Sequence, residues 1–357
     1  MFLPVLLVRD FGLMGWVVFA LPNVIGAAAM GWTLREGASE RLVARHARAI
    51  EWFRLVTVVF QLWFLGTYLM PPGGAGAGLV GLAPGDGRVL VVVALVAGLA
   101  LGLDRRLALL SWGVSIALAA AAFSREGADV PVLLTNDPGF VWLAPVCVFG
   151  FALCPYLDPT FHLARQRLSS GQARAAFSLG FGAFFLAMIV VTLMYAGWAM
   201  GVIDGSGAVN AGAVFIATHI AQQLAYTCTV HARANPQESV GRWGSARLGF
   251  AMVVAGAAAF ATAFLPSHAG LEAREVVYRS FMAFYGLVFP AYVWLRMTPL
   301  NAEPAGDNRR AMRVFWACIG IAAPMYWMGF IERQEVWLAP GLLIVLLARL
   351  LIAPRRA

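Results

Sequence analysis

Charged side chains are scarce in this sequence: only 12% of its 357 residues are Asp, Glu, Lys or Arg. Lysine is absent altogether, so all 26 basic residues are arginine. A soluble globular chain carries about 25% charged residues. With 61% hydrophobic residues and a mean hydropathy of +0.76, the chain has more apolar surface than a soluble fold of this size can bury. The sequence therefore predicts an integral membrane protein.

Cysteine is also rare, and its positions exclude two kinds of site. Cys147, Cys154, Cys228 and Cys318 all fall in apolar runs, without the paired spacing of a disulfide framework or a zinc site. The basic residues form no stripe interleaved with aromatics, although the net charge is +8. We therefore expect the partner to be the lipid bilayer and not nucleic acid.

The apolar runs predict a polytopic bundle of about eleven transmembrane helices. A bilayer needs about 20 apolar residues per helix, and the loops are too short for a second folded domain, so residues 1–357 are predicted as one all-α integral membrane domain. The two helices at 88–103 and 106–123 are shorter than the length that a bilayer-crossing helix needs. The expected spans are 11–33, 50–69, 88–103, 106–123, 139–160, 175–203, 210–231, 246–265, 275–296, 311–331 and 335–353.

The distribution of arginine between alternate loops predicts the orientation. Eighteen arginines lie at 35–48, 105–106, 165–174, 233–247, 296–313 and 355–356, against five on the opposite side, at 9, 88, 125, 274 and 333. Because cytoplasmic loops retain positive charge, we predict that the N-terminus is outside and the C-terminus inside. The exclusive use of arginine suggests a GC-rich bacterial genome, and hence a bacterial inner membrane.

Polar residues inside the membrane are costly and point to function. The first candidate is the string LPNVIGAAAMGW in span 1, with Pro22, Asn23 and Gly26. Proline removes a backbone hydrogen bond, so a broken helix with carbonyls turned toward an ion or solute is one interpretation. A proline kink beside a packing face of small residues is the alternative.

The second candidate is the end of span 5, where Pro155 and Pro159 disfavour a continuous helix. Between and beside them lies the densest polar cluster of the chain. At membrane depth, its carboxylate and imidazole would suit cation coordination or proton relay. At the cytoplasmic interface, the aspartate would instead cap the next helix. The cluster comprises Tyr156, Asp158, Thr160 and His162.

The third candidate is a polar stripe on span 7, formed by His219, Gln222, Gln223 and Tyr226. Their spacing places them on one face of a helix, and such a face is not expected to contact lipid. The stripe would either line a path for a solute or water, or form hydrogen bonds with a neighbouring helix.

Eleven spans divide into two repeats of five if the first helix stands apart. Span 2 is then the first helix of one repeat and starts on the cytoplasmic side, whereas span 7 is the first helix of the other and starts on the outer side. An inverted repeat requires these opposite starting sides. Together with the helices interrupted by proline and glycine, this organisation resembles the amino acid–polyamine–cation superfamily and the sodium:solute symporters. The resemblance implies a secondary transporter of a small solute, coupled to Na⁺ or H⁺, with a site among discontinuous helices.

Two other classes stay open. A membrane-embedded enzyme or redox subunit would use His162, His219 and Asp158, with haem or a metal ion. A noncatalytic scaffold or sensor would close its polar stripe by internal hydrogen bonds and hold no cavity. The leading hypothesis needs no cofactor beyond the coupling ion.

Overall fold

The computed structural model describes residues 2–69, 86–128, 137–203, 211–234, 245–298 and 308–352. In these ranges every regular element is helical, and the one β-bridge joins His268 to Leu271. The all-α fold class is therefore confirmed.

Six helical stretches of the described chain are long and apolar enough to cross a membrane, which indicates a multi-pass membrane protein. Four of them run through more than one helical element. Three α-helices each continue into a short 3₁₀ or π-helical turn, namely α2 (Ala38–Phe64), α5 (Phe140–Leu153) and α12 (Ala273–Tyr292), and α7 (Ser170–Leu179) continues through a π-helical turn into α8 (Leu186–Met194). The stretches are Leu3–Thr33 (α1), Ala38–Thr67, Phe140–Leu157, Ser170–Met194, Ala273–Met297 and Arg309–Phe330, the last within α13 (Asn308–Phe330).

Seven further helices complete the described fold. They are α3 (Asp86–Leu101), α4 (Ala108–Glu126), α6 (Pro159–Arg165), α9 (Ala196–Ile203), α10 (Ala211–Arg233), α11 (Ser245–Thr262) and α14 (Leu338–Ala348). Within the described residues each of the eleven predicted spans overlaps one or more helices, but only six of these stretches are long and apolar enough to cross a membrane. The number of crossings and the N-out, C-in orientation stay predictions.

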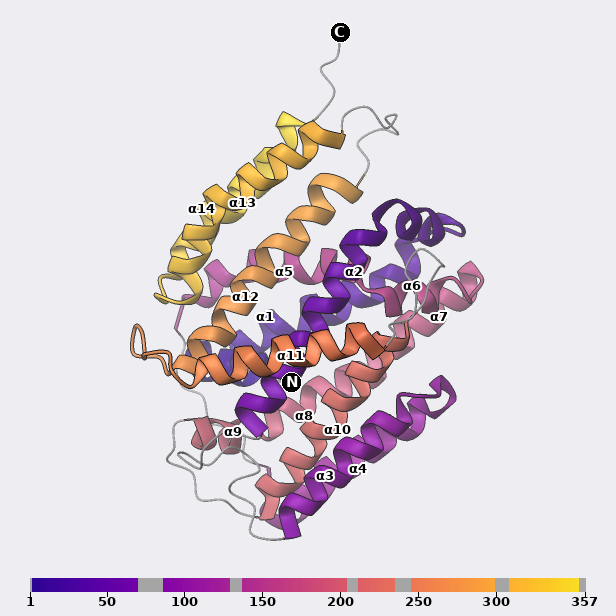
Figure 1. Cartoon of the computed structure of the whole chain (residues 1–357), viewed down its shortest axis with the longest axis vertical. Helices are drawn as coiled ribbons and strands as arrows, with labels where there is room; N and C mark the ends of the chain where they lie inside the picture. The colour runs from indigo at the N-terminus through magenta and orange to yellow at the C-terminus, as the bar shows by residue number, and fades with distance from the viewer. Residues whose placement is uncertain are drawn as a thin grey trace.

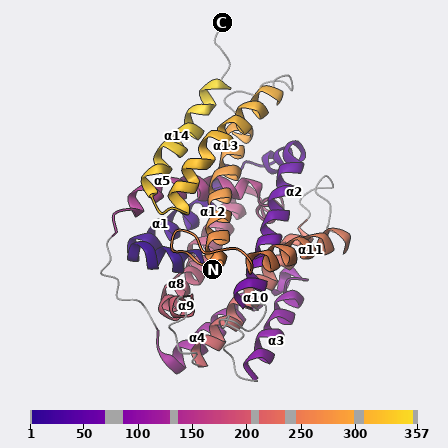
Figure 2. The same cartoon turned by 60° about the vertical axis from the view of Figure 1, so that its left-hand side comes forward.

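The helices pack in two groups around α1 and α2. At one end of the molecule α12, α13 and α14 run side by side, and at the other α3 and α4 lie along α10 (Figures 1 and 2). Between them α1 packs against α5, α7 and α8, while α10 and α11 both pack against α2. Large apolar side chains are exposed on the outer surface, among them Val253, which is 71% exposed. Such a surface is compatible with contact to lipid.

Helix α1 is broken, but at Gly12 and not at Pro22. Gly12 has φ 68° and ψ −159°, a conformation that favours glycine, and it is the one non-helical residue inside α1. The chain turns so sharply that a Cβ on Gly15 would lie 2.3 Å from the Leu7 carbonyl oxygen. The predicted break at Pro22 and Asn23 is therefore wrong in position, since the helix continues through the proline.

Of the alternative interpretation of span 1, the packing face of small residues is confirmed, whereas the proline kink is not, because the backbone stays helical at Pro22. A Cβ on Gly26 would stand 2.2 Å from the Phe151 carbonyl oxygen of α5. A Cβ on Gly31 would stand 2.6 Å from the Ala173 carbonyl oxygen of α7. Glycine at these two positions lets the backbones of three helices touch.

Candidate functional site

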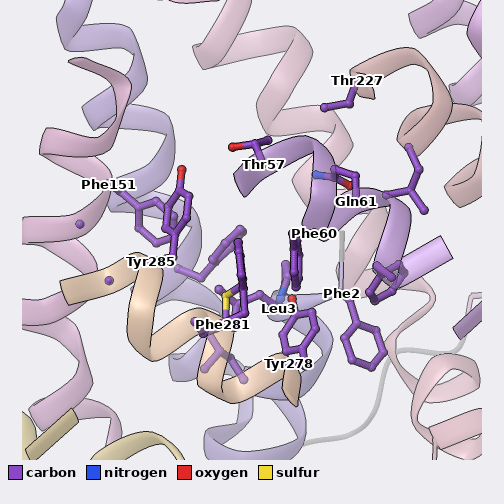
Figure 3. A pocket seen from close by; sticks show the side chains of 18 of the residues that line it. Phe2, Leu3, Thr57, Phe60, Gln61, Phe151, Thr227, Tyr278, Phe281 and Tyr285 are labelled. Carbon is purple, nitrogen blue, oxygen red and sulfur yellow. The ribbon is translucent and has the colours of Figure 1, made fainter. Parts of the chain in front are cut away.

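A cavity of about 560 Å³ lies among α1, α2, α5, α10 and α12. Its volume is typical of a site for a small organic molecule. Most of the lining is apolar, and Asp158 is the only charged side chain among the described lining residues. Figure 3 shows Phe60, Phe281, Tyr278 and Tyr285 gathered at this pocket, with Thr57 and Gln61 beside them from α2.

Aromatic rings form the wall between α2 and α12. Phe60 and Phe281 stack with their ring centroids 3.6 Å apart and their planes 8° from parallel. Phe2, from the segment before the break in α1, meets Tyr278 edge to face at 5.0 Å. The break at Gly12 thus allows the first residues of the chain to close one side of the cavity (Figure 3).

Some side chains of the polar stripe on α10 form hydrogen bonds with α4, and some line the cavity. Gln222 is fully buried and donates to the Ser111 hydroxyl at 2.7 Å, away from the cavity. Gln223 donates at 2.7 Å to the hydroxyl of Ser115, which also lies 2.9 Å from Nδ1 of His219. These contacts orient the side chains, as the interhelical interpretation predicted. His219, Gln223 and Tyr226 nevertheless also line the cavity.

Asp158 both caps a helix and lines the cavity. The chain leaves α5 through a 3₁₀ turn at Cys154–Leu157, and α6 begins at Pro159, as the two prolines predict. Asp158 Oδ1 accepts hydrogen bonds from the Thr160 backbone N–H at 2.8 Å and from its hydroxyl at 2.7 Å. The carboxylate of Asp158 therefore both caps α6, as predicted, and lines the cavity, and Thr160 holds it in place.

His162 and Tyr156 lie outside this cavity and connect helices. His162 is buried, with Nδ1 2.8 Å from the Ser39 hydroxyl and Nε2 2.9 Å from the Tyr156 carbonyl oxygen. Burial lowers the pKa of His162 below its usual value, which favours the neutral imidazole. The Tyr156 hydroxyl lies 2.8 Å from the Thr33 hydroxyl. These contacts tie α6 to α2 and the end of α5 to α1.

The three predicted candidates therefore converge only in part. Spans 5 and 7 bring Asp158, His219, Gln223 and Tyr226 to the cavity, but Pro22, Asn23 and Gly26 do not reach it. From span 1 only Phe19 lines the cavity, together with Phe2, Leu3, Pro4 and Leu7, which precede the predicted span. The described residues contain no group of three or more His, Cys, Asp or Glu that could hold a metal ion.

Sequence analysis missed a buried cluster of four charges beside the cavity wall. Arg279 and Glu275 lie one turn apart on α12, 2.8 Å from each other. Arg279 also pairs with Asp10, and Arg9 donates to Glu275 at 3.0 Å. Its paired members are separated by up to 269 positions in the sequence, so no local motif signals it.

A second cavity of about 540 Å³ adjoins the first. It lies among α4, α6, α10 and the π-helical turn Gly180–Phe185 that joins α7 to α8. Four residues line both cavities: Phe185, Met188, Gln223 and Tyr226. A π-helical turn is often found at functional sites, and here it carries one of the shared side chains.

These observations indicate a helical multi-pass membrane protein with two adjoining cavities. No protein-family model, curated protein or solved structure matches the chain.

Proposed function

We propose that the protein is a secondary transporter that carries a small solute across a bacterial inner membrane, coupled to Na⁺ or H⁺. The observation that carries the proposal is the cavity that α1, α5 and α10 share with α2 and α12. The helices around it are interrupted at Gly12 and at Pro155, as the helices around transporter sites commonly are. The second cavity supports a path, since four residues line both cavities.

The other two classes have less support. A scaffold is expected to close its polar stripe by internal hydrogen bonds and to hold no cavity. His219, Gln222 and Gln223 do contact serines of α4, but His219 and Gln223 also line a cavity. An enzyme built on His162, His219 and Asp158 needs the three together. His162 is instead held by Ser39 and Tyr156, outside the cavity lined by the other two.

The lining favours an organic cation with an apolar or aromatic body as the solute. A cation gains about 0.5–2 kcal/mol from each favourable contact with an aromatic face. Phe60, Tyr278 and Phe281 offer such rings, and Asp158 is the one carboxylate among the described lining residues. An anionic solute would meet that carboxylate without a compensating arginine among the described lining residues.

Uptake by proteoliposomes tests the proposal. The probe is radiolabelled N-methyl-phenylpyridinium, a permanent aromatic cation, and biphenyl carboxylate is an anion of similar size. We expect the protein to accelerate uptake of the cation when a proton or sodium gradient is imposed, and to leave the anion unaffected. Uptake equal to that of empty liposomes, for this probe and for a broad panel of other solutes, would refute a transport function.

Two aspartate variants show whether the cavity carries the uptake. Asp158→Asn removes the negative charge but retains an oxygen that caps α6, because asparagine caps helices as well as aspartate does. Asp104→Asn is the matched control, since Asp104 also accepts a backbone hydrogen bond, from Arg106, but is exposed and lies outside the cavity. We expect uptake to fall at least tenfold in the first variant and to be unchanged in the second.

A further inference from the structure

We infer that Asp158 is shared between the cavity and His231, so that a proton on His231 and a cationic solute compete for one carboxylate. The inference rests on the proposed function and deepens it, because it identifies the coupling ion as H⁺ and the site where that proton binds. Neither His231 nor its relation to Asp158 is apparent from the sequence.

The two oxygens of Asp158 have different surroundings. Oδ1 is held by the backbone N–H and the hydroxyl of Thr160. Oδ2 lies 3.8 Å from Nε2 of His231, which is too long for a hydrogen bond but near enough for an ion pair once the imidazole is charged. The capping contacts therefore fix the carboxylate while leaving one oxygen available.

His231 is placed to receive a proton. It lies in the last turn of α10 and is 7% exposed, yet its Nδ1 atom has no hydrogen-bond partner among the described residues. Most buried polar atoms in proteins have a partner. An imidazole that pairs with a carboxylate through Nε2 gains most from that pairing when it is positively charged.

Charged and titratable side chains from several neighbouring helices lie near the pair formed by Asp158 and His231. Arg54 of α2 donates at 2.7 Å to the carbonyl oxygen of Ala234, just after His231, and pairs with Glu51, which also binds Arg247 of α11. On the side of Asp158 lie His162 of α6 and Tyr285 of α12. After α3, Asp104 and Arg106 are exposed to the surroundings. The negative charge of Glu51 offsets part of the positive charge of Arg54 and Arg247, so His231 is not surrounded by cations alone.

The exchange involves one proton and forms no bond other than N–H. With His231 neutral, the full negative charge of Asp158 is available to a cation in the cavity. In the neutral form of this exchange the ring hydrogen is on Nδ1, the added proton binds Nε2, and the new Nε2–H turns onto Oδ2 to form an ion pair. The carboxylate is then neutralised, so the cation loses its counter-charge and leaves. One proton bound in this way corresponds to one cation released.

The pH dependence of binding tests this competition. Equilibrium dialysis measures N-methyl-phenylpyridinium binding to the full-length protein in detergent, between about pH 5.5 and 8, the range in which imidazoles titrate. We expect the affinity to fall with acidification, approaching about tenfold per pH unit, as the release of one proton requires. His231→Gln should bind within about twofold of the wild-type affinity at the alkaline end and lose most of the pH dependence.

The outcomes separate the inference from the proposed function. Wild-type binding that is independent of pH, or an unchanged pH dependence in His231→Gln, would overturn the competition while leaving a cation site intact. No wild-type binding at any pH, with no transport of any solute, would overturn both. Asp104→Asn should reproduce the wild-type profile. The elution volume and melting temperature of each variant confirm folding, and His231→Asn replaces His231→Gln if the latter is misfolded.

Discussion

The guanidinium of Arg279 pairs with the carboxylate of Asp10, although the two residues are 269 positions apart. The pair ties α12 to the short segment of α1 that precedes Gly12. The same segment carries Phe2 and Leu3, which line the cavity. Arg279 also donates to Glu275 at 2.8 Å, so a buried ionic cluster holds this wall of the cavity in place.

Replacing Arg279 with methionine should destabilise the protein strongly. The substitution leaves Asp10 and Glu275 buried with only Arg9 to balance them. Removing one partner of a buried ion pair costs about 3–5 kcal/mol. Thermal unfolding in detergent should show a clear fall in melting temperature. The matched control is Glu332→Gln, which removes an exposed partner of His268 and should leave the melting temperature unchanged. Equal effects of the two variants would contradict a structural role for the buried cluster.

Gly26→Ala should also destabilise the protein, through steric overlap. The new methyl group would meet the Phe151 carbonyl oxygen at 2.2 Å, so α1 and α5 must move apart. Overpacking of this kind costs about 1–3 kcal/mol. In Gly113→Ala, by contrast, the methyl group has no neighbour within 4 Å, and α4 should gain up to about 1 kcal/mol from helix propensity. Opposite shifts of the two melting temperatures are expected, and a neutral Gly26→Ala would mean that the helices are not in contact there.

Acid should destabilise the protein through His162. Burial lowers the pKa of His162 in the folded state, while an unfolded histidine titrates at about 6.5. Below that pH the unfolded chain binds a proton that the folded chain does not. The stability due to neutral His162 is therefore complete above about pH 6.5 and is lost as the pH falls, with a slope of at most about 1.4 kcal/mol per pH unit. His162→Gln should flatten this slope in denaturant unfolding measured at several pH values; parallel profiles for the two proteins would contradict the assignment.

Hydropathy and proline were sufficient to predict much of the helical organisation. Each apolar run became helical because a helix satisfies its own backbone hydrogen bonds in lipid. The stop at Pro155 and the new start at Pro159 follow from the same local chemistry. Pro22 failed as a signal because a proline inside a packed helix costs one hydrogen bond and need not end the helix. Gly12 carries the break instead, but the sequence offers no way to distinguish it from other glycines in apolar runs.

The candidate site was harder to predict because its residues meet across long sequence separations. Asp158, His219 and Gln223 could be named because polar side chains are rare in apolar helices. Their partners could not: Ser115 lies 104 residues from His219, and no pattern in the sequence marks His231, the last residue of the predicted span 210–231. Pairings of this kind depend on how the helices are packed, which hydropathy does not specify.

Tyr226 should control passage between the two cavities, if the proposed path is correct. It lines both of them, together with Phe185, Met188 and Gln223. Tyr226→Ala removes the aromatic ring from this shared wall, so bound N-methyl-phenylpyridinium should be released about tenfold faster, equivalent to about 1.4 kcal/mol of barrier. Leu224→Ala is the matched control, because Leu224 lies on the same helix but lines the first cavity alone. Stopped-flow dilution of the bound probe measures both rates. Similar rates in the two variants would mean that the solute does not leave through the second cavity.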